Sequence, residues 1–236
     1  MHRPEAILFD FYNTLGVGDA DDGAEEVAIL AEFGYQVEAA ALLTARGHLQ
    51  RRLDAAQALD HRQHSRSRTH YNEFQRALFA SALRDLGVDP QHPGCFERLC
   101  DLWDDPGRLR LFDDALPALG RLRAAGVRLG VVSNWSWGLQ AVLDQTGVAS
   151  LVECVVISAQ AGYRKPHPEI YTQALDAVAL RPEAVWFVGD TPDCDVAGPL
   201  AAGMTPVHID RFDAHPRLPA VQRVRDLLEL TALLGV

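Results

Sequence analysis

The stretch ILFDFYNTLG, residues 7–16, joins a short apolar run to an acid and then to residues that form turns. Residues 7–9 are apolar and predict a buried β-strand, which ends at Asp10. Residues 13–16 supply the chemistry of a tight turn. Functional groups gather at the carboxyl ends of parallel strands, so Asp10 is a candidate for catalysis.

The composition excludes several classes of partner. The 236 residues carry a formal net charge of -10, which argues against nonspecific binding of nucleic acid. No apolar run approaches the roughly 18 residues that a membrane span needs. The chain runs straight into its first strand without the pattern of a signal peptide. We therefore expect a cytoplasmic protein that binds neither nucleic acid nor membranes.

The hydrophobic pattern divides the chain into two kinds of region. Residues 18–105 show helical periodicity, with predicted helices over 24–34, 39–59, 71–86 and 96–103. From about residue 108, short apolar strands alternate with helices. The predicted strands cover 127–134, 154–157, 184–190 and 205–209, and the predicted helices cover 114–126, 139–146, 169–179, 196–202 and 221–233.

This alternation predicts an α/β fold: a Rossmann-like three-layer core with a parallel sheet covered on both faces. The helical region interrupts the pattern directly after the first strand, and we interpret it as an inserted α-helical cap domain. The predicted boundaries place residues 1–17 and 106–236 in the core and residues 18–105 in the cap.

Polar side chains follow the predicted strands at the same edge of the sheet. They are Asp10, Thr14, Ser133, Asn134 and Asp190, with Lys165 in a proline-containing loop and Asp195 five positions after Asp190. Lys165 is the only lysine among 22 basic residues, which favours a site that needs a compact charge. Taken singly, each acid is also explained as a helix cap. Together they suit a phosphoryl group bridged by Mg²⁺.

These residues resemble the motifs of the haloacid dehalogenase (HAD) superfamily, in the branch with a helical cap inserted after the first strand. The resemblance covers nearly the whole chain. Asp10-x-Tyr12-x-Thr14 matches the first motif, Ser133 the second, Lys165-Pro166 the third, and Gly189-Asp190 with Asp195 the fourth.

The resemblance implies roles for these positions. Asp10 is expected to attack as a nucleophile and form a covalent aspartyl intermediate. Mg²⁺ is expected to bind Asp10, Asp190 and the backbone carbonyl of Tyr12, with Asp195 in or beside the ligand shell. Lys165 is expected to neutralise charge between Asp10 and the phosphate, and Ser133, Asn134 and Thr14 to contact the phosphoryl oxygens or the nucleophile.

Tyr12 leaves two hypotheses open. Phosphatases of this family usually carry a second Asp at this position as the general acid and base, whereas the dehalogenases carry a tyrosine and need no metal. The acidic fourth motif favours a phosphatase, because clustered carboxylates repel one another without a cation. Tyr12 then indicates a good leaving group or another proton donor such as a cap histidine, unless it simply packs against the cap.

Our first interpretation is thus a Mg²⁺-dependent phosphatase of a small phosphorylated metabolite, active as a monomer or homodimer. The alternative is a hydrolytic 2-haloacid dehalogenase that uses Asp10 as its nucleophile. A further alternative is a catalytically weakened binding protein.

The basic stretch over residues 60–71 is expected either to contact a second anionic group of the substrate or to form a solvated loop. Its members are His61, Arg62, His64, Arg66, Arg68, His70 and Tyr71. The spacing of His61 and His64 is only weak evidence for a metal, since Asp60 is the only acid beside them. Trp135 and Trp137 are expected to wall the pocket or to pack beneath the next helix.

Overall fold

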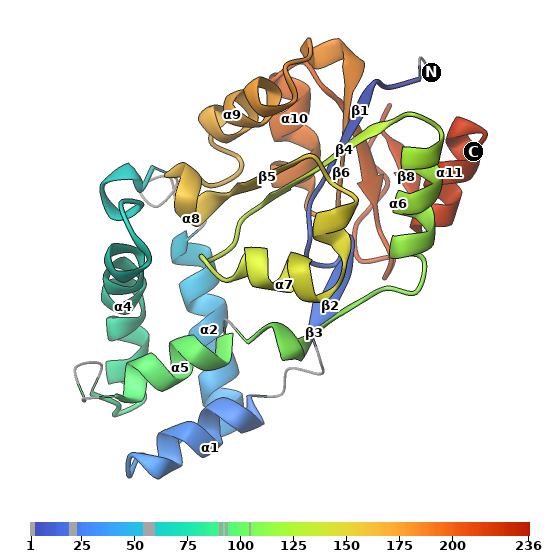
Figure 1. The fold of residues 1–236 in the computed structure, drawn as a ribbon. Helices are drawn as coiled ribbons and strands as arrows, with labels where there is room; N and C mark the ends of the chain where they lie inside the picture. The colour runs from blue at the N-terminus through green and yellow to red at the C-terminus, as the bar shows by residue number, and fades with distance from the viewer. Residues whose placement is uncertain (1–2, 19–22, 54–59, 90–91, 93, 104) are drawn as a thin grey trace.

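The computed structural model describes residues 3–18, 23–53, 60–89, 92, 94–103 and 105–236. Its main feature is a parallel six-stranded sheet in the order β5-β4-β1-β6-β7-β8 (Figure 1). The strands are β1 (Ala6–Phe9), β4 (Arg128–Ser133), β5 (Cys154–Ile157), β6 (Val185–Gly189), β7 (Thr205–Ile209) and β8 (Gln222–Val224). The predicted first strand therefore lies at the centre of the sheet.

Side chains of β1 alternate between two apolar layers. Ile7 and Phe9 join one buried cluster, and Ala6 and Leu8 join the other. The helices on the first face are α6 (Ala115–Ala124), α7 (Leu139–Gln145) and α11 (Leu227–Leu234), and α9 (Pro168–Val178) covers the second. A sheet buried on both faces explains the nearly continuous apolar runs of its strands. The predicted three-layer α/β fold is confirmed.

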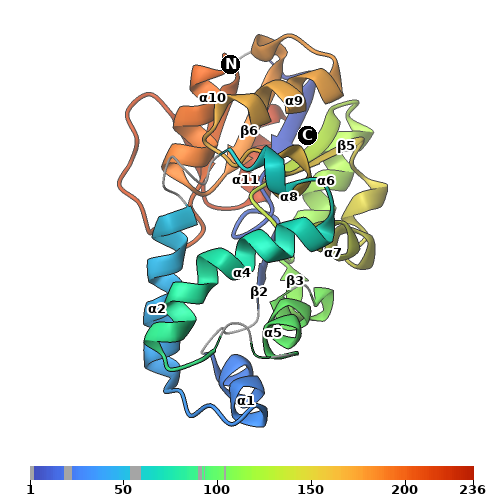
Figure 2. The same cartoon turned by 90° about the vertical axis from the view of Figure 1, so that its left-hand side faces the viewer.

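The long helical region lies between two short strands, β2 (Gly16–Gly18) and β3 (Leu109–Leu111), which pair antiparallel. Its helices are α1 (Ala24–Glu32), α2 (Ala39–Leu53), α4 (Arg68–Asp85) and α5 (Cys95–Trp103). They share an apolar cluster of their own and gather at the end of the molecule toward which β1 runs (Figures 1 and 2). Within the described ranges, no helix has both the length and the apolar character needed to cross a bilayer.

The elements differ from the prediction at short segments. The predicted helix over 221–233 is wrong in its first part, because residues 222–224 pair with β7 as an edge strand. The helix instead starts after Asp226, whose carboxylate accepts a hydrogen bond from the backbone N–H of Glu229 at 2.7 Å. The predicted helix over 196–202 begins earlier, with a π-helical turn, η5 (Pro192–Ala197), before α10 (Gly198–Ala201). The predicted helix over 39–59 is seen as far as Leu53; residues 54–59 lie outside the described ranges.

Candidate active site

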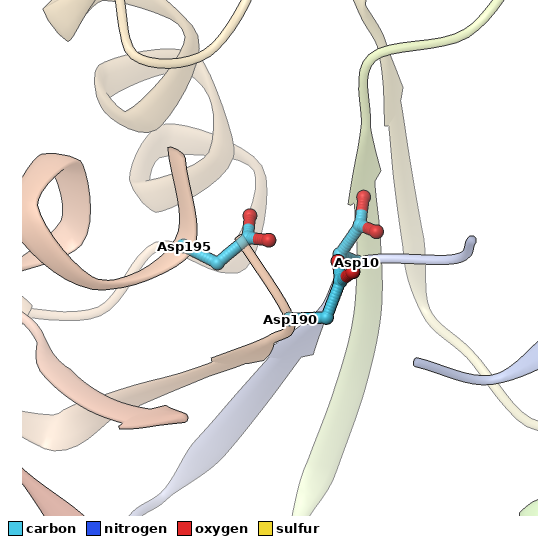
Figure 3. Close-up of side chains that lie close together, drawn as sticks. All are labelled: Asp10, Asp190 and Asp195. Carbon is cyan, nitrogen blue, oxygen red and sulfur yellow. The ribbon is translucent and has the colours of Figure 1, made fainter. Parts of the chain in front are cut away.

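Three carboxylates converge at the carboxyl edge of the sheet. Asp10 follows β1 and Asp190 follows β6, and these strands are direct neighbours. Asp195 reaches toward them from the η5 turn (Figure 3). One oxygen from each of the three carboxylates lies within 4.8 Å of the others. The structure therefore brings together the three acids that the sequence placed in one site.

Lys165 lies between two of these acids. Its Nζ donates to Oδ1 of Asp10 and to Oδ1 of Asp195, each at 2.7 Å. The Ser133 hydroxyl donates to the same Asp10 oxygen at 2.9 Å. Burial alone lowers the pKa of Lys165, but Asp10 and Asp195 outweigh this and raise it above its ordinary value. The side chain is thus a permanent cation that fixes the orientation of the Asp10 carboxylate.

Both oxygens of Asp195 already accept hydrogen bonds. Oδ1 binds Lys165, and Oδ2 accepts from the backbone N–H of Thr191 at 3.0 Å. Burial raises the pKa of Asp195 even though Lys165 opposes the change. The carboxylate packs directly on Gly189, where an added Cβ would lie 2.4 Å from the Asp195 Cγ. The glycine of the fourth motif is therefore required by the close approach of its second acid.

Asp190 is less fully engaged. Its oxygens accept from the Asn13 amide and the Thr191 hydroxyl, both at 3.3 Å. Burial and the neighbouring Asp10 raise the pKa of Asp190. Asn13 reaches it from a left-handed backbone conformation (φ 57°), which asparagine tolerates better than most residues. The Asp10–Asp190 pair is thus the part of the cluster where repulsion is least relieved.

Thr14 and Asn134 occupy the site in different ways. The Thr14 hydroxyl is completely buried, and no atom in the described part of the chain hydrogen-bonds to it. The Asn134 amide donates to the Lys165 carbonyl at 2.9 Å and accepts from the Lys165 N–H at 2.7 Å. Because both ends of this amide are in use, the geometry favours positioning of the lysine loop over the predicted contact of Asn134 with phosphate.

Tyr12 lies at the rim of the site. It is 39% exposed, and its ring centroid is 6.0 Å from that of Trp135. The Trp135 ring also meets Phe11 edge-on at 5.6 Å, so this tryptophan packs against the core while bordering Tyr12. Trp137 packs against the same apolar cluster. Tyr12 therefore has room to contact a bound molecule.

The haloacid dehalogenase-like hydrolase family matches residues 4–203. This chain belongs to that family. A glyceraldehyde 3-phosphate phosphatase of Methanopyrus kandleri is 32% identical to this HAD-like hydrolase over 167 residues, which is 64% of this chain and 70% of the relative. A phosphoserine phosphatase of Thermus thermophilus is 32% identical over 161 residues, 66% of this chain and 64% of the relative.

Solved structures of the family have the same fold. An L-2-haloacid dehalogenase of Xanthobacter autotrophicus superimposes with a TM-score of 0.72 at 20% identity over 98% of both chains. At this identity the likeness establishes the fold alone. The resemblance inferred from the four motifs is confirmed at the level of the superfamily, and the protein is a hydrolase of that family.

Sequence reasoning missed two residues that brace this HAD-like site from β7 and the segment after it. The buried His208 donates from Nε2 to the Asp190 carbonyl at 2.9 Å. Arg211 donates to the Thr14 carbonyl at 2.7 Å and 3.1 Å. A histidine inside an otherwise apolar strand was the available signal for the first. No local pattern marks the second, since Thr14 and Arg211 are 197 positions apart.

Proposed function

We propose that this HAD-like hydrolase is a Mg²⁺-dependent phosphatase of small phosphorylated metabolites, with Asp10 as the nucleophile. The observation that carries the proposal is the charge of the cluster. When ionised, Asp10, Asp190 and Asp195 bring three negative charges, against which the described residues set one paired cation, Lys165. A divalent cation matches the remaining charge, and oxygen ligands are those that Mg²⁺ prefers.

The donor set fits such an ion. The second oxygen of Asp10 accepts no hydrogen bond from the described residues, and Asp190 makes only long ones. These two carboxylates and the Tyr12 carbonyl would hold the metal, whereas Asp195 anchors Lys165 because its oxygens are already occupied. Bound there, Mg²⁺ would neutralise the charge of the phosphoryl oxygens and keep the carboxylates ionised.

The side chains then divide the reaction between them. Lys165 and Ser133 fix the orientation of the Asp10 carboxylate, which attacks phosphorus as the bond to the leaving oxygen breaks. The Lys165 charge stabilises the phosphoryl oxygens, and the unpartnered Thr14 hydroxyl has a hydrogen bond to donate. Water then attacks phosphorus, releasing inorganic phosphate and restoring the Asp10 carboxylate.

Tyr12 limits which phosphate compounds can be hydrolysed, because it determines which leaving groups can depart. A phenol is a poor base at neutral pH, so Tyr12 is a weak substitute for the usual second Asp. Among the cap histidines, His61 is not protonated at neutral pH and cannot supply the proton, because burial and then Arg164 lower its pKa to about 4. We infer that the substrate carries a good leaving group, as an acyl, anomeric or aryl phosphate does. Tyr12→Asp should then speed hydrolysis of alkyl phosphates, and an unchanged rate would count against this inference.

Tyr12 also supports the second candidate, a 2-haloacid dehalogenase, since a halide leaves without a proton. Parallel assays separate the two: phosphate release from p-nitrophenyl phosphate and chloride release from 2-chloropropionate, each with Mg²⁺ and with EDTA. We expect phosphate release that EDTA abolishes, Mg²⁺ restores and Asp10→Asn lowers by about 10⁴-fold or more. Chloride release that persists in EDTA would assign the dehalogenase activity instead.

The helical region supports a domain proposal. Because its helices bury an apolar cluster separate from the two layers of the sheet, we infer a cap over residues 18–105 and a core made of 1–17 and 106–236.

A further inference from the structure

Arg164, the residue before Lys165, is a buried cation without a partner among the described residues. Its side chain is 6% exposed, yet it forms no ion pair or hydrogen bond with any residue in the described ranges. The Nε atom is fully buried and unsatisfied. A buried guanidinium is unfavourable unless an anion or a set of acceptors compensates for the lost hydration.

The nearby acids do not compensate Arg164. Asp10 and Asp195 are both bound to Lys165 at 2.7 Å. Asp60, on the facing segment, is paired with Arg62 at 2.8 Å. The positive charge of Arg164 is therefore available to an anion from outside the chain.

A second unsatisfied group, His61, lies on the segment before α4 that pairs with the loop carrying Arg164. The backbone N–H of His61 donates to the Gly162 carbonyl at 2.8 Å, and Asp60 forms a β-bridge with Tyr163. These contacts hold the His61 segment against the loop that carries Arg164. The His61 ring is 1% exposed, and its Nε2 has no hydrogen-bond partner among the described residues.

The surroundings keep His61 neutral and orient it. Burial and, next, the charge of Arg164 lower the pKa of His61 to about 4. The Ser65 hydroxyl lies 3.1 Å from Nδ1 and 3.4 Å from the His61 carbonyl. When the hydroxyl donates to Nδ1, the nearer atom, the ring proton is on Nε2, and His61 becomes a hydrogen-bond donor.

This pair lies close to the Asp10 site. Arg164 adjoins Lys165, so their Cα atoms are about 3.8 Å apart. The His61 ring contacts Tyr71, with centroids 5.6 Å apart, and Tyr71 belongs to the same buried cluster as Phe11, which directly follows Asp10. Arg164 is therefore connected with the site through Lys165, and His61 through Tyr71.

We propose that Arg164 and His61 bind a second oxyanion of the substrate, a carboxylate or a phosphate, while the phosphoryl group that is removed lies at Asp10. The proposal rests on the proposed phosphatase function and names its substrate class: phosphate esters that carry a second anionic group. The planar fork of arginine suits two-point binding of either oxyanion.

The kinetic test compares substrates that share a skeleton. The two arms compare 4-carboxyphenyl phosphate and 1,4-phenylene bisphosphate, which add a carboxylate and a phosphate, with phenyl phosphate, since an aryl leaving group needs no proton donor. We expect wild-type kcat/KM to favour one or both anionic substrates, and Arg164→Gln to reduce that preference by about 10- to 100-fold. Arg164→Lys should retain part of it. Arg66→Gln is the matched control, since it removes an equal charge from an exposed side chain of the same segment, and it should leave the preference unchanged.

A binding measurement separates this proposal from the phosphatase function. Calorimetry with malonate in EDTA should show binding to the wild type and to Arg66→Gln, weakened at least 10-fold in Arg164→Gln and weakened in His61→Phe. Arg164-dependent malonate binding in a protein that hydrolyses no phosphate ester would support the oxyanion site and overturn the phosphatase function. Phosphatase activity whose substrate preference is unchanged in a folded Arg164→Gln protein would overturn the oxyanion site alone.

Discussion

Lys165 and Arg164 are adjacent in the chain and almost equally buried, but their surroundings differ. Lys165 has a carboxylate on each side, with both N–O distances at 2.7 Å. Arg164 has no carboxylate partner among the described residues and faces a neutral histidine. The first arrangement satisfies its charges within the chain and so forms a rigid site. The second leaves a charge to be satisfied by a ligand.

The largest effect on the free energy of unfolding is expected when Lys165, the cation paired with two carboxylates, is replaced. Lys165→Met leaves Asp10 and Asp195 buried beside each other without their shared cation. Breaking a buried ion pair from one side costs about 3–5 kcal/mol, so we expect a loss of this size in the free energy of unfolding. Urea denaturation in EDTA measures it without help from a bound metal. A loss below about 1 kcal/mol would mean that the two carboxylates do not depend on Lys165.

A smaller effect is expected from His61, and it depends on pH. The groups that act on the ring are Arg164, His64 and Asp60, and its pKa falls from the ordinary 6.5 to about 4. Between these values the unfolded chain binds a proton that the folded chain does not. The contribution of neutral His61 to the free energy of unfolding is therefore fully present above pH 6.5. It is lost as the pH falls toward 4, by up to about 3 kcal/mol.

His61→Gln removes this titration. The stability advantage of the wild type over the variant should shrink as the pH is lowered from 7 to 4. Urea denaturation of both proteins at several pH values measures the difference. Parallel curves for the two proteins would show that His61 is not held in its neutral form.

The smallest effect is expected from Arg164, and it sharpens the comparison with Lys165. Arg164→Met removes a charge that has no partner among the described residues, and the methionine keeps most of the apolar contacts of the side chain. We expect the free energy of unfolding to stay the same or to rise by up to about 1 kcal/mol, because the variant no longer buries an uncompensated charge. The same urea series measures it. A loss of 3 kcal/mol or more would reveal a partner for Arg164 within the protein.

The acidic site was predictable because its members follow strands of one parallel sheet. Asp10, Ser133 and Asp190 each end or follow an apolar run, and strand order alone brings them to one edge. Lys165 was identified as the only lysine among 22 basic residues and by its match to a family motif, rather than by any pattern in the strands. Its two carboxylate partners follow from how the loop before α9 folds back onto the sheet.

The features of the fold and of the site that the sequence did not predict depend on contacts between distant segments. The segments that carry Arg164 and His61 lie together because the segment before α4 pairs with residues 162–163, a register that neither segment encodes by itself. The three-residue strands β2, β3 and β8 are too short to show an alternating pattern, which explains why the helix predicted from residue 221 began too early. The commitment of Asn134 to the lysine backbone likewise appears only when both loops are in place.

The central claim is that Asp10 attacks phosphorus, and the most direct measurement is the site of the phosphoryl group during turnover. The enzyme is mixed with ³²P-labelled acetyl phosphate and Mg²⁺, quenched in acid within the first turnover, and digested for mass spectrometry. The account predicts label on the peptide that contains Asp10, absent in Asp10→Asn. Label on another residue, or phosphate release from an enzyme that never carries label, would contradict it.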